Sequence, residues 1–196
     1  GGALVHFAVS NREVEMTTRL EGPATRFLPF NRGDHGGKGN PSDGPGHPTA
    51  YLWEEVWQRD SWLEILGRYM VTKRDAKKRI TGAIFPRYHQ LDATRKLAAK
   101  VLGEGPGGRF LIQHSAGSGK TNSIAWSAHF LSELHDADDN KLFSSVIVVS
   151  DRNVIDSQLQ EALFDFSGSR VSSRRSRVRA APRAGNWPRL WPPARR

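Results

Sequence analysis

The residues best suited to chemistry in this sequence lie between Ser115 and Thr121, which read SAGSGKT. Glycines at positions 117 and 119 let the backbone turn its N–H groups toward an anion, at the positive end of the following helix. The Lys120 ammonium is placed to reach the β- and γ-phosphates of a nucleotide, and the Thr121 hydroxyl to ligate Mg²⁺. We therefore predict a nucleoside triphosphate site here.

One position departs from the phosphate-loop pattern G-x-x-x-x-G-K-[ST], because His114 stands where the first glycine is expected. The alternative is a chance GSGKT in a glycine-containing turn. The flanks argue against it, since an apolar run at 110–113 precedes the turn and apolar residues recur after it at the period of an α-helix. The predicted phosphate-binding residues are His114, Ser115, Ala116, Gly117, Ser118, Gly119, Lys120 and Thr121.

The elements around this loop predict an α/β fold. Residues 143–150, FSSVIVVS, form a continuous apolar run of the kind that is buried in a parallel sheet. Helical spacing returns after it. The predicted βαβα order is strand 110–113, helix 121–135, strand 145–150 and helix 153–166, with a right-handed crossover.

A helix is also predicted over residues 85–102, favoured at its start by Pro86 and stopped by the glycines of 103–108. Its first turn carries the pattern aromatic-Pro-Arg-x-x-Gln, with Gln90 lying 30 residues before Lys120. This resembles the glutamine motif that precedes the phosphate loop of superfamily 2 helicases. That resemblance implies that the Gln90 amide reads the adenine edge, by the pairing proteins use for adenine in DNA.

The chain upstream of residue 81 divides into strands, a loop and helices. Residues 4–9 and 14–18 alternate as the two strands of a hairpin. Glycines and prolines make 31–48 a long loop, which we read as a domain boundary. Residues 49–69 are helical by pattern, with a capping-box spacing from Ser61 to Glu64. Their tryptophans (Trp53, Trp57 and Trp62) are expected in the core rather than as platforms for stacked bases.

Two charged runs have modest interpretations. The run from Lys73 to Arg79, KRDAKKR, is read as a solvated surface, with contact to DNA phosphates as the alternative. The run from His135 to Asn140, HDADDN, lacks the glycine and distal glutamate of a calcium loop, so we expect a solvated turn.

Composition separates the last residues from the body of the 196-residue chain. Of the 29 lysines and arginines, nine arginines lie in 170–196, which hold no acidic residue; the other 20 basic residues balance the 20 acidic ones. The net charge of +9 therefore belongs to this segment. No apolar run approaches the ~18 residues of a membrane span. The absence of cysteine fits a cytoplasmic protein.

Several blocks of the sequence together resemble the restriction (R, endonuclease and motor) subunit of type I restriction–modification enzymes. They are VHFAVSNREVEMTTRLEGPATRFLPFNRG (5–33), TAYLWEEVWQRDSWLEIL (49–66), IFPRYHQLDATRKL (84–97), IQHSAGSGKTNSIAW (112–126) and SVIVVSDRNVIDSQLQ (145–160). The resemblance implies a PD-(D/E)xK nuclease domain joined to RecA-like motor domains that translocate DNA with ATP and Mg²⁺. It also implies DNA and the methyltransferase and specificity subunits as partners.

On this resemblance the chain is expected to be a fragment, with domains at 1–33 (end of the nuclease), 34–80 (linker and helical connector) and 81–168 (first half of a motor domain). Residues 169–196 are read as an out-of-frame or disordered tail, or else as an arginine-rich DNA-binding arm. No catalytic residue is expected within the chain, so the isolated chain should be inactive, although the family cleaves DNA.

Asp151 has two interpretations, since it ends an apolar strand. It is either a Walker B carboxylate for Mg²⁺ or the start of helicase motif Ia, and we favour motif Ia. The resemblance then implies that Arg152 and Gln158 contact DNA. Two other functions remain as alternatives: an inactive nucleotide-binding fragment of a truncated gene, and a DNA-binding protein that acts through its arginine-rich tail.

Overall fold

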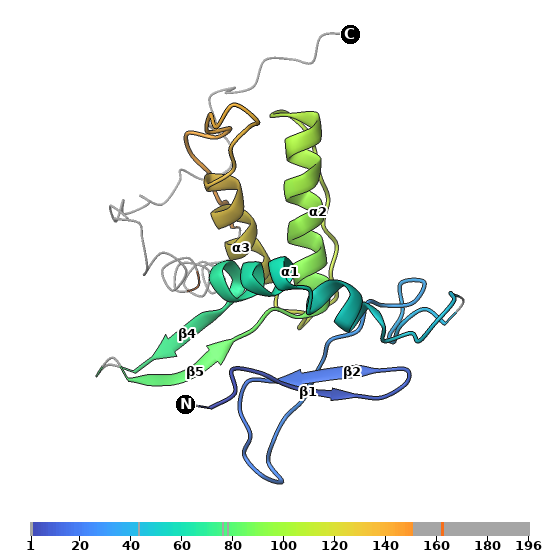
Figure 1. The fold of residues 1–196 in the computed structure, drawn as a ribbon. Coiled ribbons are helices and arrows are strands. Elements are labelled where there is room, and N and C mark those ends of the chain that lie inside the picture. The colour runs from blue at the N-terminus through green and yellow to red at the C-terminus, as the bar shows by residue number, and fades with distance from the viewer. Residues whose placement is uncertain (1, 43, 76, 78, 151–161, 163–196) are drawn as a thin grey trace.

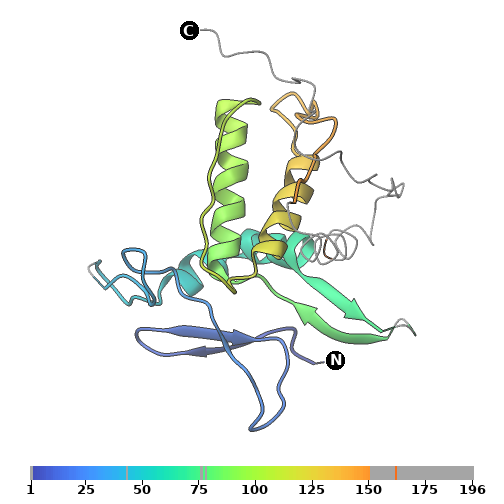
Figure 2. The same ribbon diagram turned by 180° about the vertical axis from the view of Figure 1, so that it is seen from behind.

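The structure is a computed structural model, and it describes residues 2–42, 44–75, 77, 79–150 and 162. In it a small antiparallel sheet and a separate hairpin lie on one side of a helical connector (Figure 1). Helices α2 (Tyr88–Glu104) and α3 (Lys120–Ser132) stand side by side on the other, which the reverse view also shows (Figure 2). The described part of the chain is thus a mixed α/β structure.

The predicted N-terminal hairpin is confirmed. Strands β1 (His6–Val9) and β2 (Val14–Thr17) pair antiparallel around a turn that the Ser10 side chain stabilises. Its hydroxyl oxygen accepts the backbone N–H groups of Arg12 and Glu13 at 3.2 and 3.0 Å. A third short strand, β3 (Leu28–Pro29), pairs with β2 and completes the order β1-β2-β3.

The described residues of the glycine- and proline-rich stretch 31–48 form no helix or strand, as expected. The stretch is nevertheless fixed by the buried side chain of Asn40. The Asn40 amide nitrogen donates to the carbonyl oxygen of Arg12 and to Asn31 Oδ1, both at 2.8 Å, and Asn40 Oδ1 accepts the Arg32 N–H. This loop therefore packs against the hairpin.

The predicted helical stretch 49–69 forms three short pieces: η1 (Leu52–Val56), α1 (Arg59–Glu64) and η2 (Ile65–Tyr69), where η marks a π-helical turn. The predicted capping box is wrong, because α1 begins at Arg59 and no side chain caps it. The side chains of Ser61 and Glu64 instead accept hydrogen bonds from Arg95 of α2. We refer to 52–69 as the connector.

The prediction that the connector tryptophans belong to the core is wrong for two of them. Trp53 and Trp57 are 42% and 43% exposed, and Trp62 is half-buried. The buried residues of the first turn are Leu52 and Val56, while Trp57 contacts the edge of the core through Phe7, with ring centroids 5.6 Å apart.

A second hairpin follows the connector, with β4 (Val71–Arg74) paired antiparallel to β5 (Ile80–Ile84). The basic run from Lys73 to Arg79 covers the end of β4 and the turn before β5. Its charged residues gave no alternating apolar pattern from which strands could be predicted. Asp75 shapes the turn, since its Oδ1 accepts the N–H groups of Lys77 and Arg79, both at 2.9 Å.

Two predicted helices are confirmed, and two predicted strands are wrong. Helix α2 ends at Gly105, whose φ of 76° favours glycine, and α3 ends three residues earlier than expected. The segments 110–113 and 145–150 are extended but pair with no strand among the described residues, and Leu111 and Ile147 are 91% and 83% exposed. A parallel strand obtains its hydrogen bonds only from neighbouring strands, and in the part of the chain that the structure describes neither segment is paired with one.

One hydrophobic core joins the N-terminal sheet, the connector and both long helices. Phe30 is fully buried, and its ring centroid lies 5.4 Å from that of Phe7, 6.1 Å from Phe85 and 5.8 Å from Tyr88. Burial of such rings is a main source of folding free energy. The core cluster comprises Val14, Met16, Phe30, Tyr51, Leu52, Val56, Ile65, Tyr69, Phe85, Tyr88, Leu91, Trp126 and Phe130.

The predicted division at residues 33/34 and 80/81 stays a prediction. The predicted helix 153–166 and the segment 169–196 lie outside the described residues apart from residue 162. In the described part of the chain, no helix is long and apolar enough to cross a membrane.

The shared core predicts the effect of Phe30→Ala. Removing this buried ring should cost about 3–5 kcal/mol of unfolding free energy. It should also lower amide hydrogen-exchange protection in α2, because Phe30 packs on Tyr88. Urea unfolding and exchange measured by mass spectrometry would test both. The control Leu20→Ala removes a side chain that is 56% exposed and should change stability by about 0.5 kcal/mol or less. Unchanged α2 protection in Phe30→Ala would show that the N-terminal segment folds separately.

Candidate nucleotide-binding site

The glycine-rich loop leads directly into α3. Gly117 and Gly119 have φ values of 73° and 80°, which L side chains rarely adopt. Gly119 is the N-cap of the helix, and its carbonyl oxygen accepts the N–H groups of Asn122 and Ser123 at 3.0 and 3.3 Å. The loop therefore presents the first turn of α3, with its unpaired N–H groups, as the sequence predicts.

Gln90 binds this loop from α2. Its Nε2 donates to the carbonyl oxygens of Gly119 and Ser118, at 2.9 and 3.2 Å. Its Oε1 accepts the Arg87 N–H at 2.9 Å, which caps the start of α2. Gln90 is 3% exposed, so these bonds are shielded from water. The residue predicted to read adenine and the predicted phosphate loop thus form one hydrogen-bonded unit.

Glycine is required at position 119 for a second reason. A Cβ atom there would lie 2.6 Å from Gln90 Nε2, whereas a Cβ at Gly117 would meet nothing within 4 Å. Any side chain at position 119 would therefore displace the Gln90 amide from its two acceptors.

Lys120 is exposed and lies over the loop. Its ammonium donates to the carbonyl oxygens of Ser115 and His114, at 2.8 and 3.2 Å. The residue in the place of the first motif glycine thus contributes its backbone, which explains how histidine is accommodated. Thr121 follows in the first helical turn, half-buried, and Ala116 is exposed in the turn of the loop. Ser118 Oγ is buried and has no hydrogen-bond partner among the described residues.

His89 is a site residue that the sequence did not indicate. Its Nε2 lies 3.0 Å from the carbonyl oxygen of Ser118, and its ring meets that of His114 edge-on at 4.8 Å. Burial lowers the pKa of His89, an effect that the Ser118 carbonyl partly opposes. Because a carbonyl oxygen can only accept, the neutral ring carries its proton on Nε2. The only available signal was its place beside Gln90.

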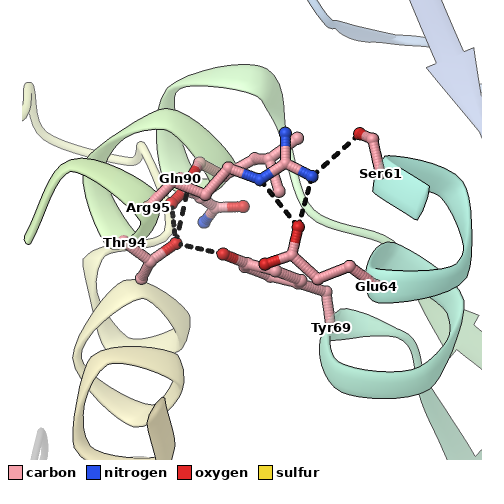
Figure 3. Close-up of polar contacts among 7 residues, drawn as sticks. Ser61, Glu64, Tyr69, Gln90, Thr94 and Arg95 are labelled. Atoms are coloured by element: carbon pink, nitrogen blue, oxygen red, sulfur yellow. Dashed lines mark hydrogen bonds and ion pairs between the residues drawn. The ribbon is translucent and has the colours of Figure 1, made fainter. Parts of the chain in front are cut away.

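The connector is hydrogen-bonded to α2, the first helix of the site (Figure 3). Arg95 of α2 donates to Glu64 Oε2 at 2.9 Å and to Ser61 Oγ at 2.8 Å, which accounts for the two residues of the supposed capping box. Thr94, one residue earlier, shares a hydrogen bond of 2.9 Å with the Tyr69 hydroxyl. The connector is thereby attached to the first two turns of α2.

The remaining predicted site residues are elsewhere. Asp151, Arg152 and Gln158 lie outside the described residues. In the acidic turn, Asp136 Oδ1 accepts the N–H groups of Asp138 and Asn140, so this carboxylate shapes the loop. Across the described part of the chain, no three His, Asp or Glu side chains gather as a possible metal site.

Comparison with known protein families matches residues 83–182 to ResIII, described as the res subunit of type III restriction enzymes. The matched stretch is just over half of the chain and contains α2, the loop and α3. This chain belongs to the ResIII family. Comparisons with curated proteins and with solved structures gave no match.

ResIII membership implies a RecA-like, helicase-type fold and the ATP-dependent activity of restriction-enzyme motors. The match supports the prediction that the chain belongs to the helicase-like subunits of restriction enzymes. It does not distinguish a type I enzyme from other types. The N-terminal sheet and the connector precede the matched stretch, which begins within β5 of the second hairpin. The match extends through residue 182 into the segment predicted to be a tail, whose assignment stays a prediction.

The two loop glycines allow a matched test of the Gln90 bonds. Both Gly117→Ala and Gly119→Ala force an L residue into left-handed backbone, at about 1–2 kcal/mol. Only Gly119→Ala should pay about 1–3 kcal/mol more, because it separates Gln90 from two acceptors. Denaturant unfolding measures the difference, and faster hydrogen exchange of the Gln90 side-chain amide would report the lost bonds. Equal destabilisation by the two variants would contradict the proposed contact.

Proposed function

We propose that this chain is the ATP-binding part of the R subunit of a type I restriction enzyme. The observation that carries the proposal is the bond between the Gln90 amide and the Ser118 and Gly119 carbonyls. It puts a group suited to adenine beside a loop suited to phosphates, in a segment of the ResIII family. The type I assignment is supported by the resemblance of residues 5–33 and 49–66, which lie outside the matched stretch.

Each residue has a chemical role in this proposal. The Lys120 ammonium exchanges its bonds to the Ser115 and His114 carbonyls for oxygens of the β- and γ-phosphates. Gln90 exchanges one of its two N–H bonds to the loop for adenine N7, while its Oε1, which accepts one N–H here, has a second lone pair for adenine N6. The loop N–H groups hold the phosphates, and the Thr121 hydroxyl ligates Mg²⁺.

In the complete enzyme, hydrolysis of the bound ATP would supply the free energy for DNA translocation, and Mg²⁺ would neutralise charge on its phosphates. The partners proposed for the whole protein are DNA and the methyltransferase and specificity subunits. The chain by itself is proposed to bind nucleotide without hydrolysing it or cutting DNA. Hydrolysis needs a carboxylate that holds the metal and a group that positions the attacking water. The proposal places Asp151 in motif Ia, which leaves neither role to a residue of this chain.

Replacing Lys120 should remove ATP binding. In Lys120→Ala the loop loses its only assigned cationic contact to the β- and γ-phosphates, so titration calorimetry with Mg–ATP should detect no binding. Lys100→Ala is the matched control, because Lys100 is an exposed lysine paired with Glu104 at the far end of α2. That variant should bind ATP as the unaltered chain does. Unchanged affinity in Lys120→Ala would reject the site.

DNA binding by the isolated chain should depend on residues 170–196, since the other residues carry no net charge. Deleting 170–196 should abolish the binding and its steep salt dependence, measured by fluorescence anisotropy on a short duplex. The β4–β5 hairpin is the structural alternative, because Lys73 and Lys77 lie in and next to its strands. If binding survives the deletion and is lost in Lys73→Ala/Lys77→Ala, the hairpin binds DNA and the tail does not.

A further inference from the structure

Tyr69 is the point at which the connector contacts both helices of the nucleotide site. It is fully buried at the end of η2 and precedes the stretch matched to ResIII. Its ring packs on Trp126 and Phe130 of α3, with centroid distances of 5.7 and 4.7 Å. Its carbonyl oxygen accepts the Trp126 Nε1–H at 3.0 Å. The ring and backbone of Tyr69 therefore belong with α3.

The hydroxyl of Tyr69 belongs with α2 instead (Figure 3). It lies 2.9 Å from Thr94 Oγ1, which is itself 2.7 Å from the carbonyl oxygen of Gln90. Thr94 has one hydroxyl proton, and it donates this proton within its own helix, to the carbonyl oxygen of Gln90 at 2.7 Å and also toward that of Leu91 at 3.1 Å, because a carbonyl oxygen can only accept. The Tyr69 hydroxyl must then donate to Thr94. Burial raises the pKa of Tyr69 to about 12, so it keeps this proton at neutral pH.

This directed chain of hydrogen bonds ends on the backbone of the residue proposed to read adenine. The Gln90 carbonyl is held by Thr94, and the Gln90 side chain is held by the loop carbonyls of Ser118 and Gly119. Side-chain networks of this kind polarise one another in a water-excluded interior. Lys120, which is proposed to bind the phosphates, and Thr121, which is proposed to ligate Mg²⁺, are both on α3. Among the described contacts, neither residue touches the Tyr69 hydroxyl.

We propose that Tyr69 is a positioning residue for the nucleotide base, acting through Thr94 on Gln90. This inference rests on the proposed ATP-binding function. It predicts that the Tyr69 hydroxyl affects recognition of adenine and leaves recognition of the triphosphate unchanged. The connector, which lies outside the family match, is then part of the nucleotide site.

The test is Tyr69→Phe in the full chain, which removes the hydroxyl and keeps the ring between Trp126 and Phe130. Affinities for Mg–ATP, Mg–GTP and inorganic tripolyphosphate are measured by calorimetry. ATP affinity should fall about two- to tenfold, as for loss of one buried hydrogen bond, while the other two affinities stay unchanged. Thr94→Val is a second variant that breaks the same chain and should give the same selective loss.

Tyr51→Phe is the matched control. The Tyr51 hydroxyl is also buried and donates to a carbonyl oxygen, that of Phe30 at 2.6 Å, but in the described part of the chain it forms no hydrogen bond with Gln90 or Thr94. The Tyr51→Phe variant should therefore have the same ratio of ATP affinity to GTP affinity as the unaltered chain. In a Gln90→Ala background, Tyr69→Phe should have no further effect on that ratio, because residues that act as one unit are not additive.

Three outcomes would overturn the inference. Tyr69→Phe could lower the affinities for all three ligands by the same factor, as expected if Tyr69 only stabilises the fold. It could leave ATP affinity unaltered, or act additively with Gln90→Ala. Failure of the proposed function itself looks different: the unaltered chain then binds neither ATP nor tripolyphosphate. An unaltered chain that binds ATP and GTP equally retains its phosphate loop but refutes base reading by Gln90, and with it the role of Tyr69.

Discussion

The side-chain amide of Gln90 is the contact on which the arrangement of this site depends. It joins the beginnings of two helices that are separated by the whole glycine-rich segment between them, and it does so through the backbone carbonyls of Ser118 and Gly119. Because the amide is buried, leaving its donors without acceptors would be costly. The contact also means that a side chain at position 119 would force the Gln90 amide to shift. It also explains why α2 begins where it does, since the same side chain caps its first turn.

The connector packs against both α2 and α3. Its ion pair with Arg95 and the aromatic packing of Tyr69 reach α2 and α3, respectively, from a segment that precedes the family match. Ion pairs that are half shielded from water contribute modestly, so most of the attachment comes from burial of aromatic rings. The core continues from there to Phe30 in the N-terminal sheet. The candidate nucleotide-binding segment therefore shares its packing with elements outside the family match.

Two apolar segments that were predicted as strands, 110–113 and 145–150, form no strand among the described residues. Residues 110–113 lead into the loop, and Ile147 and Val149 are exposed in the segment after α3. A RecA-like fold, which family membership implies, buries such segments in a parallel sheet. In the described residues the loop accepts hydrogen bonds from Gln90 and contains two glycines with positive φ, and α2 packs against α3.

The sequence by itself determined the parts of this protein that depend on local chemistry. Glycines that adopt positive φ, a lysine and threonine after them, and the period of apolar residues defined the loop, α2, α3 and the first hairpin. Only the tertiary structure decided which partner each polar side chain binds. Ser61 and Glu64 have the spacing of a helix cap, but α1 begins at Arg59, so Ser61 lies inside the helix and both side chains bind Arg95 of α2. The contacts of Gln90, Thr94 and Tyr69 join residues far apart in the chain, and the failure of two apolar runs to form strands depends on neighbours that local sequence does not specify.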